Sequence, residues 1–169
     1  MMMYEESATS TIDLLAPPQQ VFEFLDDPAV VGAHMQKPSL MMLGATMEYD
    51  VDAGNGQVVG SIVKMRGKVL GMELFVEEIV TEWQPPWRKS WQTLGHPKLL
   101  VIDSYHMDFV VSPISGGSRV IVKIQYSYSR SPLGSWLGGV PARAYAKWCV
   151  SKMTTDAGSH FAPAPQNRR

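Results

Sequence analysis

Alternation of apolar and polar residues is the strongest pattern in the chain, and it predicts a run of β-strands between two helical regions. The clearest case is 119–128, where every second residue from Val120 to Tyr128 is aliphatic or aromatic. Such a period of two is typical of a strand with one buried face. Less regular patterns predict further strands at 9–16, 46–51, 57–65, 72–83, 87–94 and 99–111. Turn-forming residues separate them, and Asp52–Gly56 (DAGNG) predicts a hairpin turn.

A spacing of four residues replaces this alternation near the end of the chain. Tyr145, Cys149, Met153 and Ala157 form one apolar stripe, which predicts an amphipathic helix over 141–161. Its first residue is a proline, which is tolerated there because the missing N–H would have no partner inside the helix. Two shorter helical segments are predicted at 19–27 and 29–35, after the first strand.

The order of these elements predicts an α+β fold. Short connections favour antiparallel neighbours, so the strands should form one sheet of six to seven strands. The apolar stripe of the last helix has to be buried against something, and the sheet is the only large surface that the pattern offers. We therefore expect a strongly curved antiparallel sheet wrapped around a long C-terminal helix.

Composition narrows the class of protein. The chain has 169 residues, of which 45% are hydrophobic and 18% charged, with a formal net charge of −1. These values predict one domain (7–161, with disordered ends at 1–6 and 162–169) and disfavour nucleic acid as the main partner. Cys149 is the single cysteine, which excludes an internal disulfide and fits a reducing cytoplasm. We find no signal-peptide pattern, no apolar run long enough to span a membrane, and no metal-binding or cofactor motif.

Four stretches resemble one known family. They are APPQQVFEFLDDP at 16–28, VTEWQPP at 80–86 followed by Trp91, MDFVVSPISGGSRV at 107–120, and the closing helix. Together they resemble the START-like superfamily of polyketide cyclases, dehydrases and lipid-transport proteins. The resemblance implies a helix-grip fold with a cavity between the sheet and the last helix, usually holding a hydrophobic or amphipathic molecule.

Strand parity, anchored on those motifs, indicates which side chains face such a cavity. The same side chains could equally form a plain packed core, and the eleven methionines fit either an adaptable cavity wall or core filling. The predicted lining consists of Met72, Leu74, Val76, Val80, Trp91, Tyr105, Met107, Phe109, Val122, Ile124, Tyr126, Tyr145, Cys149 and Met153. Entry would be gated by the two short helices and the loop 38–44.

Glu78 and Asp103 are the weak candidates for chemistry. Glu78 has the inward parity of Val76 and Val80, and a buried carboxyl there would have a raised pKa and could act as an acid, a base or a ligand anchor. The reading that we favour from sequence is that a bulge near Gly71 shifts the register and turns Glu78 to water. Asp103 shares the parity of Tyr105, but such a residue more often lies at a rim.

No catalytic constellation accompanies these two acids. His106 has the outer parity of its strand, the other three histidines fall at turns or helix ends, and Cys149 should pack as a small hydrophobic residue. We therefore expect the binding or carriage of a lipid, isoprenoid or polyketide-like molecule. The alternatives are a cyclase/dehydratase-type enzyme that uses the same cavity, and an accessory protein that docks a protein partner through 133–137 and Trp136.

Overall fold

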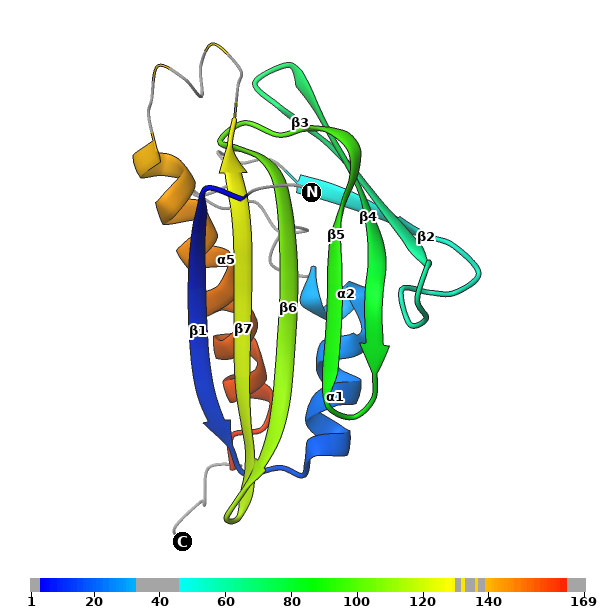
Figure 1. Cartoon of the computed structure of the whole chain (residues 1–169), viewed down its shortest axis with the longest axis vertical. Helices are drawn as coiled ribbons and strands as arrows, with labels where there is room; N and C mark the ends of the chain where they lie inside the picture. Colours follow the sequence, from blue (N-terminus) through cyan, green and yellow to red (C-terminus); the bar gives the residue numbers. More distant parts are fainter. Residues whose placement is uncertain (1–3, 33–45, 130–131, 133–135, 137–138, 164–169) are drawn as a thin grey trace, which may run out of the picture.

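The computed structural model describes residues 4–32, 46–129 and 139–163, together with the isolated residues Pro132 and Trp136. One seven-stranded antiparallel sheet has the order β1-β7-β6-β5-β4-β3-β2 and is accompanied by one long helix and two short ones (Figure 1). The predicted α+β helix-grip architecture is confirmed. In chain order the elements are β1 (Glu6–Leu14), α1 (Pro18–Asp26), α2 (Pro28–Val31), β2 (Thr46–Val51), β3 (Ile62–Val69), β4 (Met72–Gln84), β5 (Arg88–Lys98), β6 (Ile102–Ile114), β7 (Gly117–Tyr128) and α5 (Gly139–His160).

Helix α5 lies along the β1 and β7 end of the sheet, and α1 and α2 lie behind β4–β6 on the same face (Figure 1). The buried face of α5 alternates small and medium side chains, which lets this helix approach the strands closely. A hydrogen bond of 2.8 Å joins the hydroxyl groups of Ser10 on β1 and Thr154 on α5. The buried residues of α5 are Ala142, Ala146, Cys149, Val150, Met153, Thr154 and Ala157.

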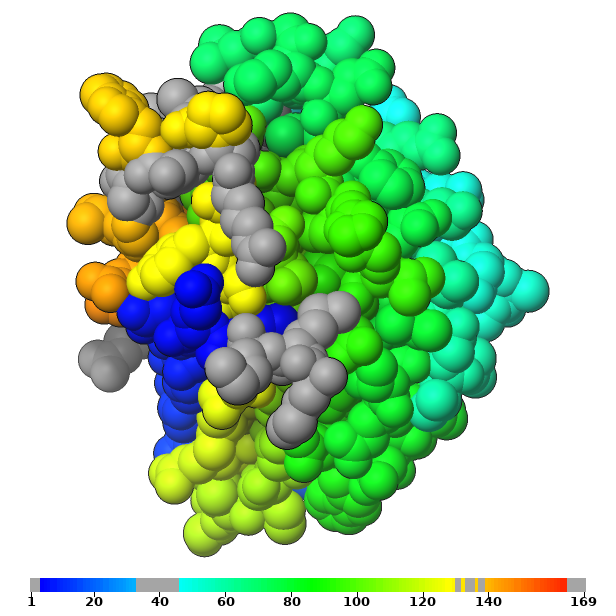
Figure 2. All heavy atoms as spheres, turned by 45° about the horizontal axis from the view of Figure 1, so that its top comes forward, coloured from blue at the N-terminus to red at the C-terminus, as the bar shows by residue number. Residues whose placement is uncertain are grey.

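Helix α1 fixes the opposite end of the same face. Val21, Phe22 and Leu25 are almost completely buried, and the ring of Phe22 packs 5.4 Å from that of Phe109 on β6. Helix α2 follows at once, and the Asp27 carboxylate caps it by accepting a hydrogen bond from the Ala29 N–H. The two helices therefore extend the cover that α5 begins. On the other face, β2–β5 form a continuous outer wall, coloured cyan to green in Figure 2.

The first predicted hairpin is shorter than expected. β3 begins at Ile62, and 57–61 belong to the connection rather than to the strand. The Asp52 carboxylate explains this, because it accepts hydrogen bonds from the N–H groups of Gly54 and Ile62 and from the Ser61 hydroxyl. These bonds hold a compact loop where continued strand pairing was predicted.

Gly67 and Gly71 predicted a turn or bulges, and the structure has a tight turn at Gly71 without the bulge that would have turned Glu78 to water. Leu70 and Gly71 have φ angles of +47° and +80°, as in a two-residue type I′ hairpin turn between β3 and β4. Pairing continues without interruption from Val69↔Met72 to Ile62↔Ile79. The side-chain parity of β4 is therefore unbroken up to Val80.

Residues 95–97 were predicted as a turn between two strands, but β5 runs through them to Lys98. Phe75 pairs with Lys98 and Glu77 with Leu94, so between these pairs one residue of β4 lies opposite three of β5. The intervening residues, with Gly95 at φ +69°, form a bulge that absorbs the difference. The chain turns later, at 99–101, and β6 starts at Ile102 rather than at Leu99.

Candidate ligand-binding cavity

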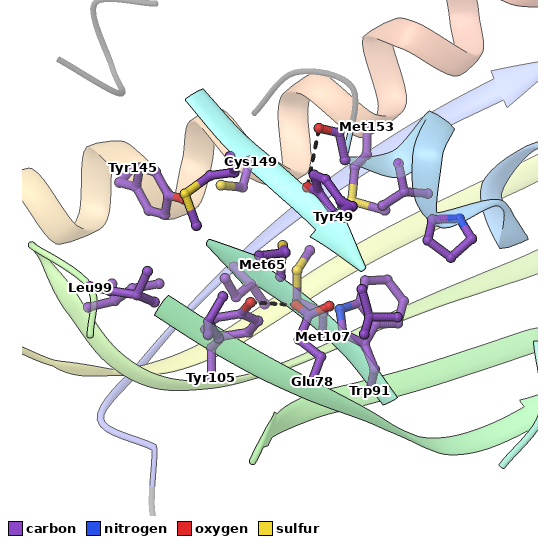
Figure 3. Close-up of a pocket in the computed structure, with 18 of the residues that line it drawn as sticks. Tyr49, Met65, Glu78, Trp91, Leu99, Tyr105, Met107, Tyr145, Cys149 and Met153 are labelled. Atoms are coloured by element: carbon purple, nitrogen blue, oxygen red, sulfur yellow. Dashed lines mark hydrogen bonds between the residues drawn. The ribbon is translucent and has the colours of Figure 1, made fainter. Parts of the chain in front are cut away.

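A cavity of about 380 Å³ lies between the curved sheet and helix α5 (Figure 3). This volume falls within the usual range of sites for small organic molecules. Apolar side chains make up most of its wall: Leu25, Val31, Met47, Val63, Met65, Leu74, Val76, Val80, Trp91, Leu99, Leu100, Val101, Ile102, Met107, Ile124, Cys149 and Met153. The polar side chains that reach it are Glu78, Lys89 and the tyrosines Tyr49, Tyr105 and Tyr145.

Most of the predicted lining residues lie on this cavity. Those that line it are Leu74, Val76, Val80, Trp91, Tyr105, Met107, Ile124, Tyr145, Cys149 and Met153. Phe109, Val122 and Tyr126 point inward but are buried in the packed core instead, with exposures of 0–1%. Met72 was predicted to line the cavity but does not. It is the first residue of β4, directly after the hairpin turn, and is 44% exposed.

Glu78 reaches into the cavity, contrary to the reading that we favoured from sequence. Because β4 carries no bulge near Gly71, Glu78 keeps the parity of Val76 and Val80. The Tyr105 hydroxyl donates a hydrogen bond to Glu78 Oε1, and the side chain of Trp91 donates another to the same carboxyl group. Figure 3 shows the carboxyl group between these two rings, on the sheet side of the cavity.

Burial controls the acidity of Glu78. Removal from water disfavours the charged form and raises its pKa from 4.5 to about 7, although the two hydrogen bonds and the nearby Lys89 act in the opposite direction. The group is therefore close to half ionised at neutral pH. A carboxyl in this state can donate or accept a proton, and can bind either a hydrogen-bond donor or an acceptor.

A buried ion pair lies beside this carboxyl. Lys89 Nζ is 2.7 Å from Asp26 Oδ1 and 2.9 Å from the Asp26 main-chain oxygen, and Trp83 Nε1 donates to Asp26 Oδ2 at 3.1 Å. Burial lowers the pKa of Lys89, and the contact with Asp26 opposes that effect. The sequence analysis missed this pair, although Lys89 lies two residues from Trp91 and so has the same inward parity.

Asp103 does not reach the cavity, and a bulge is the reason. The pairing of β6 with β7 shifts between Ile102 and Tyr105, so both of these side chains face inward. One extra residue in this stretch reverses the parity that would have placed Asp103 beside Tyr105. Ile102 takes the inward position instead.

The helix side of the cavity carries two tyrosines and the cysteine. The Tyr49 hydroxyl donates to the Gly32 carbonyl at 3.2 Å, which connects β2 to the end of α2. Tyr145 and Cys149 are hydrogen-bonded to each other, and burial raises the pKa of the thiol to about 12. Cys149 is therefore a protonated thiol at neutral pH and not an activated nucleophile. Tyr49 was not predicted as a lining residue.

None of the hydrogen bonds to Glu78 comes from a histidine of the described ranges. His106 lies on the outer face, where its ring is 6.4 Å from that of Tyr4, and His160 stacks on Phe24. Within 4–32, 46–129 and 139–163, no three His, Cys, Asp or Glu side chains are placed to hold a metal ion. His34 and the predicted gate at 38–44 lie outside the described residues. Trp136 is 82% exposed, and the rest of the predicted docking segment 133–137 also lies outside them.

The sheet, the gripping helix and the apolar cavity between them define a helix-grip protein. Residues 5–155 match the family described as polyketide cyclase / dehydrase and lipid transport, so the chain belongs to that family. This confirms the resemblance seen in the sequence. A search of curated proteins by sequence found no significant match.

Solved structures share the fold at low sequence identity. The protein CV1439 from Chromobacterium violaceum is 17% identical, with a TM-score of 0.63 over 94% of this chain and 98% of that one. The di-domain ARO/CYC protein BexL from the BE-7585A biosynthetic pathway is 16% identical, with a TM-score of 0.63 over 95% of this chain and 51% of that one. The major latex-like protein 151 from Panax ginseng is 14% identical, with a TM-score of 0.59 over 94% and 98%. Identities this low establish the common fold and nothing about ligands.

None of the helices that the structure describes has the length and apolar character needed to cross a bilayer.

Proposed function

We propose that this protein binds and carries a hydrophobic small molecule in the cavity between the sheet and α5. The cavity itself carries the proposal: about 380 Å³ of space between the sheet and the helix, with a wall that is mostly apolar. Burying apolar surface there would provide about 25 cal/mol per Å² of affinity. The family description, which includes lipid transport, supports the same conclusion.

The experiment is native mass spectrometry of freshly purified protein, followed by extraction into organic solvent. A co-purifying lipid-like molecule would support the proposal and identify a ligand. The blocking variant Cys149→Phe would fill the cavity from α5, and Ser151→Phe would add the same ring to the exposed face of that helix. We expect only Cys149→Phe to lose the bound molecule, with both variants folded by circular dichroism. Empty wild-type protein that also fails to bind an apolar fluorescent probe would contradict the proposal.

A second candidate function is catalysis of the cyclase/dehydratase type in the same cavity. The observation that favours it is Glu78, a half-buried carboxyl whose pKa is raised to about 7 and which is therefore suited to proton transfer near neutral pH. The test uses the molecule recovered by extraction, incubated with wild type and with Glu78→Gln. Conversion by wild type, with intact binding but no conversion by Glu78→Gln, would establish an enzyme. Binding without conversion by either protein would leave a carrier.

A further inference from the structure

The hydrogen bonds around Glu78 are unbalanced, and this imbalance indicates what the cavity binds. Both of its side-chain partners, Tyr105 and Trp91, act as donors to the carboxyl group. An indole N–H can only donate, whereas the tyrosine hydroxyl can also accept. None of the hydrogen bonds of the described residues supplies a further acceptor at this point.

Glu78, Tyr105 and Trp91 together have more polar hydrogens than the bonds among them can use. When Glu78 carries its proton, the three groups hold three polar hydrogens, but the bonds among them use only two. If Tyr105 donates to Glu78, the carboxyl O–H remains; if Tyr105 accepts from Glu78, its own O–H remains. In either arrangement one O–H of the pair has no acceptor among the hydrogen bonds of the described residues, and the neighbouring Met65 and Met107 offer no strong one. A polar hydrogen left unpaired in apolar surroundings is costly, so the site favours a ligand that accepts it.

We propose that the ligand is a neutral, mainly apolar molecule with a carbonyl oxygen, and that this oxygen accepts a hydrogen bond from the Glu78–Tyr105 pair. This inference rests on the proposed binding function and names the class of its ligand. The apolar part would fill the cavity towards α5, and the carbonyl would lie on the sheet side, where Figure 3 shows both residues.

The charged and titratable groups around Glu78 favour a neutral ligand over an ionic one. They come from β2, β5, β6 and α5, and are Tyr49, Lys89, Tyr105, Tyr145 and Cys149, with Asp26 paired to Lys89. An ammonium ligand would bring a second cation beside Lys89 and would have to leave water to do so. A carboxylate ligand would place a second acid next to Glu78. A carbonyl needs neither charge, and the raised pKa of Glu78 keeps the donor hydrogen available up to neutral pH.

The test is displacement of an apolar fluorescent probe by four compounds of equal chain length: a methyl ketone, a primary amine, a carboxylic acid and an alkane. Affinities are measured from about pH 5 to about pH 9, the range over which a carboxyl of raised pKa ionises. We expect the ketone to bind most tightly at low pH. Above the Glu78 pKa of about 7, its affinity should fall by about tenfold per pH unit, because only the protonated form offers the hydrogen. Alkane binding should not change with pH.

Two variants separate this donor role from a structural one. Glu78→Gln stays neutral and keeps an N–H donor, so it should retain ketone binding and lose the pH dependence. Glu78→Met alone would leave the Tyr105 O–H and the Trp91 N–H without their acceptor. The triple variant Glu78→Met/Tyr105→Phe/Trp91→Phe offers no polar hydrogen at this point, so its preference for ketone over alkane should disappear. Thermal melts of both variants show whether each is folded.

The outcomes that overturn the inference differ from those that overturn the proposed function. An amine that binds most tightly, with affinity rising above pH 7 as Glu78 ionises, would show an anionic site instead. A ketone whose affinity ignores both pH and the triple variant would remove the Glu78–Tyr105 pair from recognition. Either result leaves hydrophobic binding intact. Failure of the probe and of all four compounds to bind would reject the proposed function, and the inference with it.

Discussion

Lys89 on β5 and Asp26 at the end of α1 form an ion pair inside the protein, with 2.7 Å between Nζ and Oδ1 and only 6% of each side chain exposed. The lysine also bonds to the Asp26 main-chain oxygen, and Trp83 on β4 donates to the second carboxylate oxygen. The pair therefore connects the short helices to the sheet at the edge of the cavity. Its position beside Glu78 makes it part of the same polar cluster.

Removal of Asp26 should destabilise the protein strongly. In Asp26→Ala, Lys89 would remain buried without its partner, and breaking such pairs typically costs about 3–5 kcal/mol of unfolding free energy. Urea unfolding measures the change. Asp13→Ala is the control, because it breaks the ion pair of the same length with Arg119, whose side chains are 47% and 51% exposed. Equal losses from the two substitutions would contradict a special role for the buried pair.

Ionisation of Glu78 should make the folded protein less stable as pH rises. The folded pKa is raised from 4.5 to about 7, so between these values the native state holds a proton that the unfolded state has lost. The stabilisation is thus fully present below 4.5 and is lost as pH rises through about 7. At about 1.4 kcal/mol per pH unit, the interval corresponds to at most about 3.5 kcal/mol.

Urea unfolding at several pH values checks this sign. Glu78→Gln should remove this fall in stability. The difference in unfolding free energy between Glu78→Gln and wild type should therefore shift in favour of the variant as pH rises, most clearly above pH 7. Glu77→Gln makes the same chemical change one residue away, where the side chain faces outward and pairs with Lys64 at 3.1 Å. It should leave the shape of the wild-type profile intact. A wild-type profile without a fall between 4.5 and about 7 would show that Glu78 is not buried as described.

Glu78 and Asp103 show how far the sequence could predict the site. Parity from Val80 was sufficient to point Glu78 inward, and the error came from a bulge expected at Gly71, where Leu70 takes a positive φ and closes a two-residue turn instead. Gly71 indicated a turn or a bulge, and leucine is not a typical residue for that conformation, so the sequence did not decide between the two. For Asp103, parity from Tyr105 gave the wrong direction, because a bulge lies between Ile102 and Tyr105. No glycine or proline in this stretch of the sequence indicates that bulge.

The fold itself was easier to predict than the site. Period-two and period-four patterns indicate which faces are buried. Each pattern is read over many residues, so an error at a strand end does not alter the predicted architecture. The division between cavity wall and filled core depends on the volumes of side chains from several strands together. Phe109 and Met107 have the same parity, yet Phe109 packs against Phe22 and Met107 lines the cavity. No pattern within one strand contains that information.

Cys149 should resist alkylation in the folded protein. Burial raises the pKa of its thiol to about 12, against about 8.5 for a free cysteine, and only the thiolate reacts. At pH 8 we expect iodoacetamide to modify native protein more than about a hundredfold more slowly than urea-unfolded protein, as followed by intact mass. Rapid modification of the native state would instead mean that the cavity opens readily to water and reagents, and would weaken the case for an enclosed ligand.

The β3–β4 turn offers a prediction of increased stability. Leu70 and Gly71 both have positive φ, a conformation that asparagine adopts more easily than leucine. Leu70 is 81% exposed, so its side chain contributes little packing that a substitution could lose. Leu70→Asn should therefore raise the unfolding free energy by about 0.5–1 kcal/mol.

Gly71→Ala tests the same backbone conformation, but here we expect a loss of stability. A β-carbon at Gly71 would meet no atom within 4 Å, so any loss of stability must come from its φ of +80° rather than from a clash. We expect a loss of about 1 kcal/mol. Both changes are measured as shifts in the urea midpoint at constant slope. A stabilising alanine, or a destabilising asparagine, would contradict a type I′ turn here, and with it the unbroken β4 parity that places Glu78 in the cavity.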